Sequence, residues 1–181
     1  LRCTYCDTRQ AFGGGAHWSM QAIVDQVAAL TPRLVLITGG EPLLQANVLP
    51  LMQRLCDAGY TVCLETSGAL DIGVVDPRVH RIVDIKTPDS GEQAANRLQN
   101  LPLLSPKDEV KFVLGSAEDY AWASAFVAEH DLTARCTVLF GPIWGQLDPQ
   151  ALAAWIVRDG LCVRLQVQLH KYIWSPATQG V

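Results

Sequence analysis

The chain has 181 residues, of which 49% are hydrophobic and 18% charged, and its 14 basic and 18 acidic side chains give a net charge of −4. This length fits one domain with a substantial core. The acidic balance argues against a general nucleic-acid binder, which needs a basic face to neutralise phosphates. No apolar run reaches the roughly 18 residues that a membrane span needs, and no signal peptide is recognisable. We therefore expect a cytoplasmic protein with no nucleic-acid or membrane partner.

In chain order, strand-like and helix-like stretches alternate. Runs rich in Val, Ile and Leu, as expected of strands buried on both faces, cover 34–37, 61–66, 81–86, 109–115, 136–141 and 161–170. Periodicity and capping signals predict helices over 19–30, 44–58, 117–130 and 148–160. In the second of these helices the apolar stripe begins at Leu44. The alternation predicts right-handed crossovers, a parallel sheet and thus an α/β fold.

Glycine-rich and polar motifs follow the predicted strands. They read TGGEP (38–42), ETSG (65–68), DIKTP (84–88), FGPIW (140–144) and QLHKYIWSPATQGV (168–181). In a parallel α/β sheet the chemistry lies beyond the carboxyl ends of the strands. We therefore expect these motifs to surround one binding mouth.

The six cysteines are expected to be reduced thiols, because disulfides are rare in cytosolic chains of this size. Four of them stand among apolar residues and are expected to behave as small core hydrophobes. These four are Cys56, Cys63, Cys136 and Cys162. The other two, Cys3 and Cys6, form a CxxC pair at the start of the chain.

Three kinds of site use such a pair. A structural zinc site needs four ligands, but the chain has no second CxxC and its four histidines are scattered. A redox dithiol would open a helix, whereas here a glycine-rich loop follows. An iron–sulfur cluster held by three thiolates leaves one iron open for a further ligand. Together with TGGEP at a strand end, the pair favours the iron–sulfur loop.

These motifs resemble a known family. RCTYCDT (2–8) resembles the CxxxCxxC loop of radical S-adenosylmethionine enzymes, and LITGGEPLL (36–44) resembles their glycine-rich motif. In order, YCDT, TGGEP, ETSG, DIKTP and HKYIW resemble the 7-carboxy-7-deazaguanine synthase family, over essentially the whole chain. The resemblance implies an incomplete TIM-like βα barrel and a single radical S-adenosylmethionine core domain over 1–181.

One part of the family pattern falls outside the sequence. The third cysteine of the loop stands four residues before the first cysteine of the pair, which would place it two residues upstream of Leu1. The segment that carries the first strand and a Gln-Gly-Glu-Gly-like stretch would also lie there. We therefore expect an N-terminally truncated domain whose first strand is missing.

The resemblance also implies the activity. Family members carry out a radical-mediated ring contraction of 6-carboxy-5,6,7,8-tetrahydropterin to 7-carboxy-7-deazaguanine with release of ammonia. This carbon–nitrogen lyase reaction belongs to the queuosine and 7-deazapurine pathway, whose end product serves either tRNA modification or a secondary metabolite. The implied cofactors are a 4Fe–4S cluster, S-adenosylmethionine and Mg²⁺. The implied partners are the pterin, an electron donor such as flavodoxin or ferredoxin, and a second copy in a homodimer.

Site residues follow from the matching positions. The cluster would be held by Cys3 and Cys6, and Mg²⁺ by Thr8. S-adenosylmethionine would be bound by Tyr5, Cys6, Asp7, Gly40, Glu41, Asp84, Ile85 and Lys86. The substrate would be contacted by Thr38, His170, Lys171 and the terminal carboxylate of Val181. Apart from the cofactor, no catalytic side chain is assigned.

Plainer interpretations remain open. The Thr8 hydroxyl would then only cap its turn, and Asp84 and Lys86 would form a surface ion pair. His170 and Lys171 would belong to a solvent-exposed tail. At the level of function, the alternatives are an activase that installs a glycyl radical on a partner protein, and an inactive fragment that lacks the third cluster cysteine.

Overall fold

The computed structural model describes residues 1–176 and 178, which form a six-stranded sheet in the order β1-β2-β3-β4-β5-β6. The strands are β1 (Leu34–Ile37), β2 (Thr61–Thr66), β3 (His80–Asp84), β4 (Glu109–Leu114), β5 (Thr137–Pro142) and β6 (Arg164–Leu165). Every neighbouring pair is parallel, so each connection crosses from one end of the sheet to the other. The predicted parallel α/β fold is confirmed.

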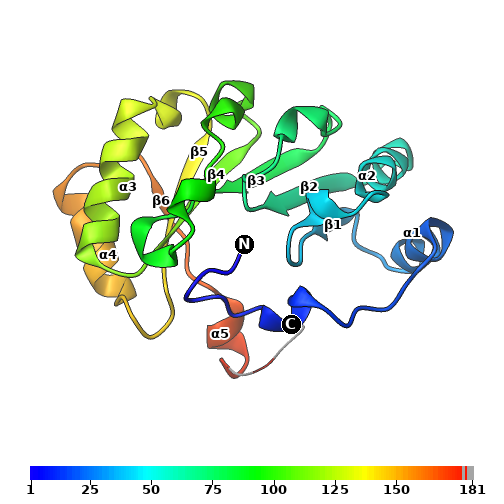
Figure 1. Cartoon of the computed structure of the whole chain (residues 1–181), viewed down its shortest axis with the longest axis horizontal. Coiled ribbons are helices and arrows are strands. Elements are labelled where there is room, and N and C mark those ends of the chain that lie inside the picture. The colour runs from blue at the N-terminus through cyan, green and yellow to red at the C-terminus, as the bar shows by residue number, and fades with distance from the viewer. Residues whose placement is uncertain (177, 179–181) are drawn as a thin grey trace.

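The sheet is flanked by five α-helices, four on one face and one on the other. They are α1 (Met20–Ala28), α2 (Val48–Asp57), α3 (Ala117–Glu129), α4 (Pro149–Arg158) and α5 (His170–Ile173). Figure 1 shows the sheet curved into an arch, with α1 to α4 along its outer side and the N-terminal loop and α5 on its inner side. This is the open half-barrel that the family resemblance implies. In the described part of the chain, no helix has the length and apolar character needed to cross a bilayer.

Alternation along the strands separates a packed face from a lining face. In β2, Leu64 is fully buried, whereas the next residue, Glu65, is only partly buried. In β4, Phe112 is fully buried and Lys111 is partly buried. Because successive side chains of a strand point to opposite faces, the buried set packs beneath the helices. The charged set is left to line the inside of the arch.

The apolar face is closed by two clusters. The larger one centres on Phe112, whose ring meets Phe126 and Phe140 edge-to-face at centroid distances of 5.9 and 5.4 Å. The smaller one seats Met52 and Leu55 of α2 over β2. Removal of this apolar surface from water is the main term that holds the helices against the sheet.

The second helix begins later than its sequence pattern predicts. It starts at Val48, and Leu44 instead ends a 3-10 turn (Pro42–Leu44) with 71% of its surface exposed. The placement of Leu44 on the buried stripe is therefore wrong. Leu44 stands at a helical spacing from Val48 in the sequence, but the helix does not extend back to it, because the backbone at Gln45 and Asn47 is not helical.

The last predicted strand is also mostly wrong. Only Arg164 and Leu165 pair with β5, and the ladder ends where the Gln166 amide donates to the Phe140 carbonyl oxygen over 2.9 Å. The chain then turns inward and forms α5. Cys162, expected in the core, is exposed at this edge, whereas Cys136 is buried and Cys56 and Cys63 are partly buried.

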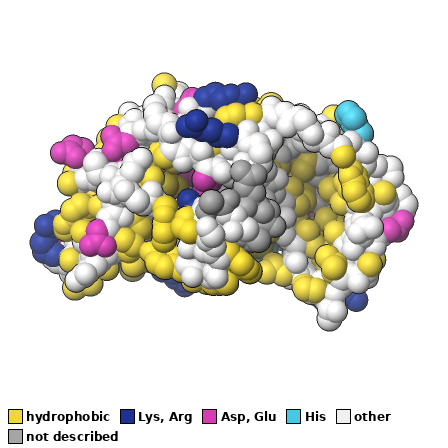
Figure 2. Space-filling model, turned by 90° about the horizontal axis from the view of Figure 1, so that it is seen from below, with side chains coloured by type: hydrophobic (Ala, Val, Ile, Leu, Met, Phe, Trp, Pro, Cys, Tyr) yellow, Lys and Arg dark blue, Asp and Glu magenta, His cyan; other side chains and the backbone are white. Residues whose placement is uncertain are grey.

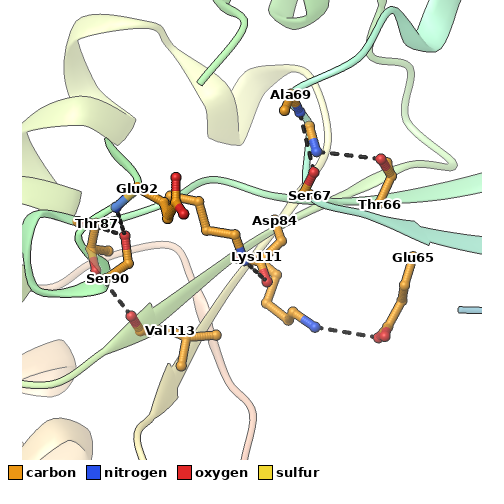
Figure 3. Close-up of polar contacts among 12 residues, drawn as sticks. Glu65, Thr66, Ser67, Ala69, Asp84, Thr87, Ser90, Glu92, Lys111 and Val113 are labelled. Carbon is orange, nitrogen blue, oxygen red and sulfur yellow. Dashed lines mark hydrogen bonds and ion pairs between the residues drawn. The ribbon is translucent and has the colours of Figure 1, made fainter. Parts of the chain in front are cut away.

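One buried carboxylate organises the loop after β3. Asp119, fully buried at the start of α3, accepts hydrogen bonds from the Thr87 hydroxyl (2.8 Å), the Asp89 amide (3.0 Å) and the Gly115 amide (3.1 Å). The Thr87 hydroxyl also lies 3.2 Å from the Val113 carbonyl oxygen (Figure 3). Asp119 thereby joins the ends of β3 and β4 at the level of the binding mouth.

We expect Asp119→Ala to lower the free energy of unfolding by about 2 kcal/mol, because it removes the acceptor of two partly buried backbone amides and the shorter of the two hydrogen bonds of the Thr87 hydroxyl. Urea denaturation of the variant measures this loss. Glu118→Ala is the matched control, since Glu118 is the preceding residue of the same helix turn and is exposed. Equal midpoints for the two variants would contradict the role given to Asp119.

Candidate active site

A cavity of about 610 Å³ opens on the inner side of the arch, at the carboxyl ends of the strands. Many of the residues selected from the sequence line it, namely Cys3, Tyr5, Cys6, Asp7, Thr8, Thr38, Gly40, Glu41, Asp84, Lys86 and Lys171. Two others have side chains elsewhere: Ile85 is buried in the larger core cluster, and His170 lies in α5 outside the lining. Val181 lies outside the described residues. The motifs thus meet at one mouth.

The loop that carries the two thiols is fastened to the segment after β3. The Cys6 amide donates to the Cys3 carbonyl oxygen over 3.2 Å, which closes the turn. Between them, Thr4 donates its amide to Ser90 and its hydroxyl to Asp89, over 3.1 and 2.7 Å. Both sulfur-bearing residues line the cavity. The turn is therefore held in place by a long-range contact as well as by its own backbone.

The end of β1 is held to the end of β2 by a carboxylate. Oε1 of Glu41 accepts from the Leu43 amide (3.1 Å) and the Thr66 hydroxyl (2.9 Å), and Oε2 accepts from the amide (2.8 Å) and hydroxyl (2.5 Å) of Ser67. Just before it, Gly39 has a φ of +136°. A side chain is strained in this conformation, so the glycine lets the backbone turn along the cavity wall.

A buried ion pair closes the floor of the cavity at the end of β3. The Lys86 ammonium lies 2.8 Å from Asp84 Oδ2, and the two side chains are only 9% and 17% exposed. The interpretation as a surface ion pair is therefore wrong. Burial opposes the charge of Lys86, but the adjacent Asp84 carboxylate outweighs it and raises the pKa of Lys86. Burial raises the pKa of the nearby Cys3 thiol, which the Lys86 charge partly offsets.

Two buried polar atoms at this pair, one of Asp84 and one of Tyr5, lack hydrogen-bond partners within the described part of the chain. They are Asp84 Oδ1 and the Tyr5 hydroxyl. Burial, with the Asp84 charge adding to it, raises the pKa of Tyr5 far above its usual value. Buried polar atoms are normally paired. These two therefore suit a polar ligand in the cavity.

A second charged pair crosses the inner face of the sheet. Lys111 reaches from β4 to Glu65 of β2, with Asp84 on the strand between them (Figure 3). The Lys111 ammonium lies 3.4 Å from Glu65 Oε1, and the Thr38 hydroxyl donates to Glu65 Oε2 over 3.2 Å. All four residues line the cavity. The inner face of β2 and β4 thus brings a donor and an acceptor side by side to the cavity.

The C-terminal segment reaches the thiol loop through Asp7. Its Oδ2 accepts from Gln168 Nε2 (2.7 Å) and lies 3.0 Å from the Lys171 ammonium, while Oδ1 accepts from the Thr8 hydroxyl (3.0 Å). Burial would raise the pKa of Asp7, but the hydrogen bonds and charge of Lys171 and the bonds from its other partners lower it below the usual value. The Lys171 side chain is only 10% exposed, so it is not part of a solvent-exposed tail.

Comparisons with known proteins agree with this geometry. A sequence profile of the Radical SAM superfamily matches residues 1–120. The 7-carboxy-7-deazaguanine synthase of Chlorobaculum tepidum is 46% identical over 99% of this chain and 83% of its own. That of Koribacter versatilis is 43% identical over 100% and 87%. The chain belongs to the 7-carboxy-7-deazaguanine synthase family of radical S-adenosylmethionine enzymes.

The fold of this synthase family is also seen in a solved structure. The crystal structure of QueE from Escherichia coli superposes with a TM-score of 0.72, covering 92% of this chain and 79% of the other, at 20% identity. At this identity the likeness concerns the fold alone. It places the arch of strands and the helices outside it in the same arrangement.

A radical S-adenosylmethionine synthase uses a 4Fe–4S cluster and S-adenosylmethionine, and the cavity suits both. Cys3 and Cys6 present two thiols on one turn, and bound iron takes the place of thiol protons. The unpaired Asp84 Oδ1 and Tyr5 hydroxyl offer an acceptor and a donor for the amino, carboxylate or ribose groups of a nucleoside ligand.

Several residues that line the cavity were not selected from the sequence. These are Glu65, Ser67, Lys111, Trp144, Gln146 and Gln168, which all line the cavity. Glu65, Ser67, Trp144 and Gln168 belong to motifs that were expected at the mouth, but no role was given to them. Glu65 and Lys111 carried a second signal, because a charged residue inside an apolar strand of a parallel sheet needs a polar face or a partner.

Proposed function

We propose that this protein converts 6-carboxy-5,6,7,8-tetrahydropterin to 7-carboxy-7-deazaguanine and ammonia, as a carbon–nitrogen lyase of the 7-deazapurine pathway that leads to queuosine. The observation that carries the proposal is the 46% identity, over nearly the whole chain, to a protein of this activity. The cavity supports it, because the five motifs of the resemblance meet there. No observation favours a glycyl-radical activase or an inactive fragment.

The polar wall of the cavity suits a reduced pterin. Such a substrate offers a carboxylate, ring N–H groups and a flat face. Lys111 can donate to its oxygens, and Glu65 and the Thr38 hydroxyl oxygen, whose proton goes to Glu65, can accept from its nitrogens. Trp144 offers an aromatic surface in the same cavity. The contact expected from His170 requires the ring to turn in from α5, and that expected from Val181 stays a prediction.

When bound, S-adenosylmethionine and the cluster supply the adenosyl radical that starts the rearrangement. The residues of this chain bind and orient the pterin, keep water away and handle protons. Lys111 Nζ and Glu65 Oε1 lie 3.4 Å apart. The Lys111 ammonium can give a proton to the departing amine, and the Glu65 carboxylate can accept a proton from the substrate. Asp84 and Lys86 hold the floor beneath the nucleoside.

We also propose that Mg²⁺ binds at Thr8, where a cation would fix the substrate carboxylate and act as a Lewis acid. The support is geometric. The Thr8 hydroxyl donates its proton to Asp7, so its lone pairs are free to face a cation in the cavity. The substrate carboxylate would supply further oxygen ligands.

Two protein partners complete the proposal: a second copy in a homodimer and an electron donor such as flavodoxin or ferredoxin. Figure 2 shows the molecule from below, with apolar side chains spread over it and a hollow on the side of α1 and β1. On and next to these elements, Leu30, Leu34 and Leu36 are 65%, 61% and 50% exposed. Because β1 is an edge strand of the described sheet, this side is open to a further element, either another strand of the same protein or a second copy.

The activity is tested with the full-length protein, reconstituted anaerobically with iron and sulfide and supplied with dithionite, S-adenosylmethionine, Mg²⁺ and the carboxytetrahydropterin. We expect 7-carboxy-7-deazaguanine and ammonia in equal amounts by chromatography and mass spectrometry. Cleavage of S-adenosylmethionine without a deazaguanine product would leave a radical enzyme of another specificity and would remove the proposal.

We expect Thr8→Val to raise the Mg²⁺ concentration needed for half-maximal rate by about tenfold or more, because losing groups around a metal commonly costs 10–100-fold in affinity or activity. Thr8→Ser keeps the hydroxyl and should stay near the parent value. Rates titrated against Mg²⁺ at saturating pterin measure the difference. If the Val variant titrates like the parent, the cation does not bind at Thr8.

A further inference from the structure

The carboxylate next to the proposed cation site is already engaged. Asp7 receives the Lys171 ammonium at 3.0 Å and the Gln168 amide at 2.7 Å on one oxygen, and the Thr8 hydroxyl at 3.0 Å on the other. Lys171 and Gln168 come from the opposite end of the chain, from α5 and the segment just before it. Two elements far apart in sequence thus converge on one side chain of the thiol loop.

The Lys171 ammonium neutralises the negative charge that Asp7 would otherwise bring to the cation site. An aspartate beside Thr8 would be a natural ligand for a hard cation. With an ammonium at 3.0 Å, however, the pair carries no net charge, and one of the two carboxylate oxygens is occupied by two donors. The lysine is 10% exposed, so water screens the pairing less than at an open surface.

The rest of the chain offers no replacement. Within residues 1–176 and 178, no three or more His, Cys, Asp or Glu side chains are grouped so as to hold a metal ion. A cation at Thr8 would meet one neutral hydroxyl and a neutralised carboxylate. The remaining ligands and the balancing negative charge have to come from outside the chain, and the carboxylate of the proposed substrate supplies both.

We propose that Lys171 and Gln168 are positioning residues that neutralise and orient Asp7, so that a divalent cation binds at Thr8 only together with the anionic substrate. This inference rests on the proposed cation site and names its regulation. The C-terminal segment holds Asp7 away from the cation. Thr8 keeps a fixed hydroxyl orientation, because Asp7 accepts its proton. The cation then binds tightly only when the pterin carboxylate is bound, and it binds weakly to the protein without the pterin.

The test measures metal binding, not turnover. Mn²⁺ is titrated into the cluster-loaded full-length protein without S-adenosylmethionine, and free Mn²⁺ is followed by electron paramagnetic resonance with and without the carboxytetrahydropterin. For the parent protein we expect the pterin to tighten Mn²⁺ binding by at least about tenfold, because it adds a negative charge next to the ion. Equal binding with and without the pterin would overturn the proposal.

Lys171→Met gives the sharper result. It frees Asp7, so Mn²⁺ binding without the pterin should tighten by about tenfold, and the further gain from the pterin should shrink to about threefold or less. Adding Asp7→Asn to this variant should return pterin-free binding to the weak parent level. Gln168→Leu should act in the same direction with a smaller effect. Arg164→Met is the charge-matched control, because Arg164 is an exposed cation of the same segment outside the cavity.

The outcomes separate this proposal from the one on which it rests. If Thr8→Val abolishes Mn²⁺ binding in the presence of the pterin but Lys171→Met leaves the pterin-free affinity unchanged, the cation site stands and the role of Lys171 is overturned. If Thr8→Val binds Mn²⁺ like the parent, the site itself is elsewhere and both ideas fail. Iron content and circular dichroism check that each variant is folded and loaded.

Discussion

Replacing Cys6 by Ser is expected to abolish cluster assembly and to lower the rate of product formation by at least about 100-fold, since changes to groups behind metal ligands already cost 10–100-fold. A serine hydroxyl is harder and far less acidic than a thiol, and iron–sulfur clusters select soft thiolates. Cys3→Ser should behave in the same way, because both residues sit on one turn that lines the cavity. Iron and sulfide per protein, together with visible absorption after anaerobic reconstitution, measure the loss.

The chain supplies its own control for this experiment. Cys162 is exposed at the edge of the sheet and lies outside the cavity, and Cys136 is buried in the core. Cys162→Ser should therefore load iron and turn over like the parent. If Cys6→Ser retains a full complement of iron and sulfide, the loop does not bind the cluster, and the assignment of the opening motif is refuted.

The site was predictable wherever a motif follows a strand of the parallel sheet. TGGEP follows β1, ETSG overlaps the end of β2 and DIKTP overlaps the end of β3. Parallel strands bring these ends to one edge of the sheet whatever the details of packing. This is why Thr38, Glu41 and Asp84 could be placed together from the sequence before any distance was known.

Residues that act through partners distant in sequence were harder to place. The alternating run from Leu161 to His170 indicates extended chain, but alternation does not say which neighbour the chain pairs with. Only two residues of it join the sheet, and the rest bends inward and delivers Gln168 to Asp7. The helix of four residues that follows is too short to leave a periodic pattern.

Sequence motifs also do not reveal which partner a charged side chain will meet in the folded protein, or whether the pair will be buried. Lys171 was expected at the substrate because it follows the last strand, and the structure places its ammonium on Asp7 within the same cavity. Lys86 and Asp84 are two residues apart and could have been an ordinary surface pair. In the structure the two side chains are instead largely buried, at 9% and 17% exposed. No local sequence pattern encodes this burial.

That burial predicts a large effect on stability. Lys86→Met is expected to lower the free energy of unfolding by about 3 kcal/mol, because removing one partner of a buried pair leaves an uncompensated charge behind. Here the remaining charge is Asp84, 17% exposed and already short of a partner on Oδ1. Urea denaturation measures the change. Arg97→Met, which removes the exposed and distant pair to Asp71 (3.9 Å), should change stability far less.

The double variant decides whether the unpaired charge is the cause. Adding Asp84→Asn to Lys86→Met removes both charges and leaves groups of similar size, so stability should recover to within about 1–2 kcal/mol of the parent. If the double variant instead loses as much stability as the two single variants together, the loss comes from packing and not from an unpaired charge. Binding of S-adenosylmethionine to the cluster-loaded protein is expected to stay weak in the double variant even where stability returns. The buried pair stabilises the fold through its mutual charge, whereas the role proposed for it in nucleoside binding depends on Asp84 Oδ1, the carboxylate oxygen without a partner among the described residues.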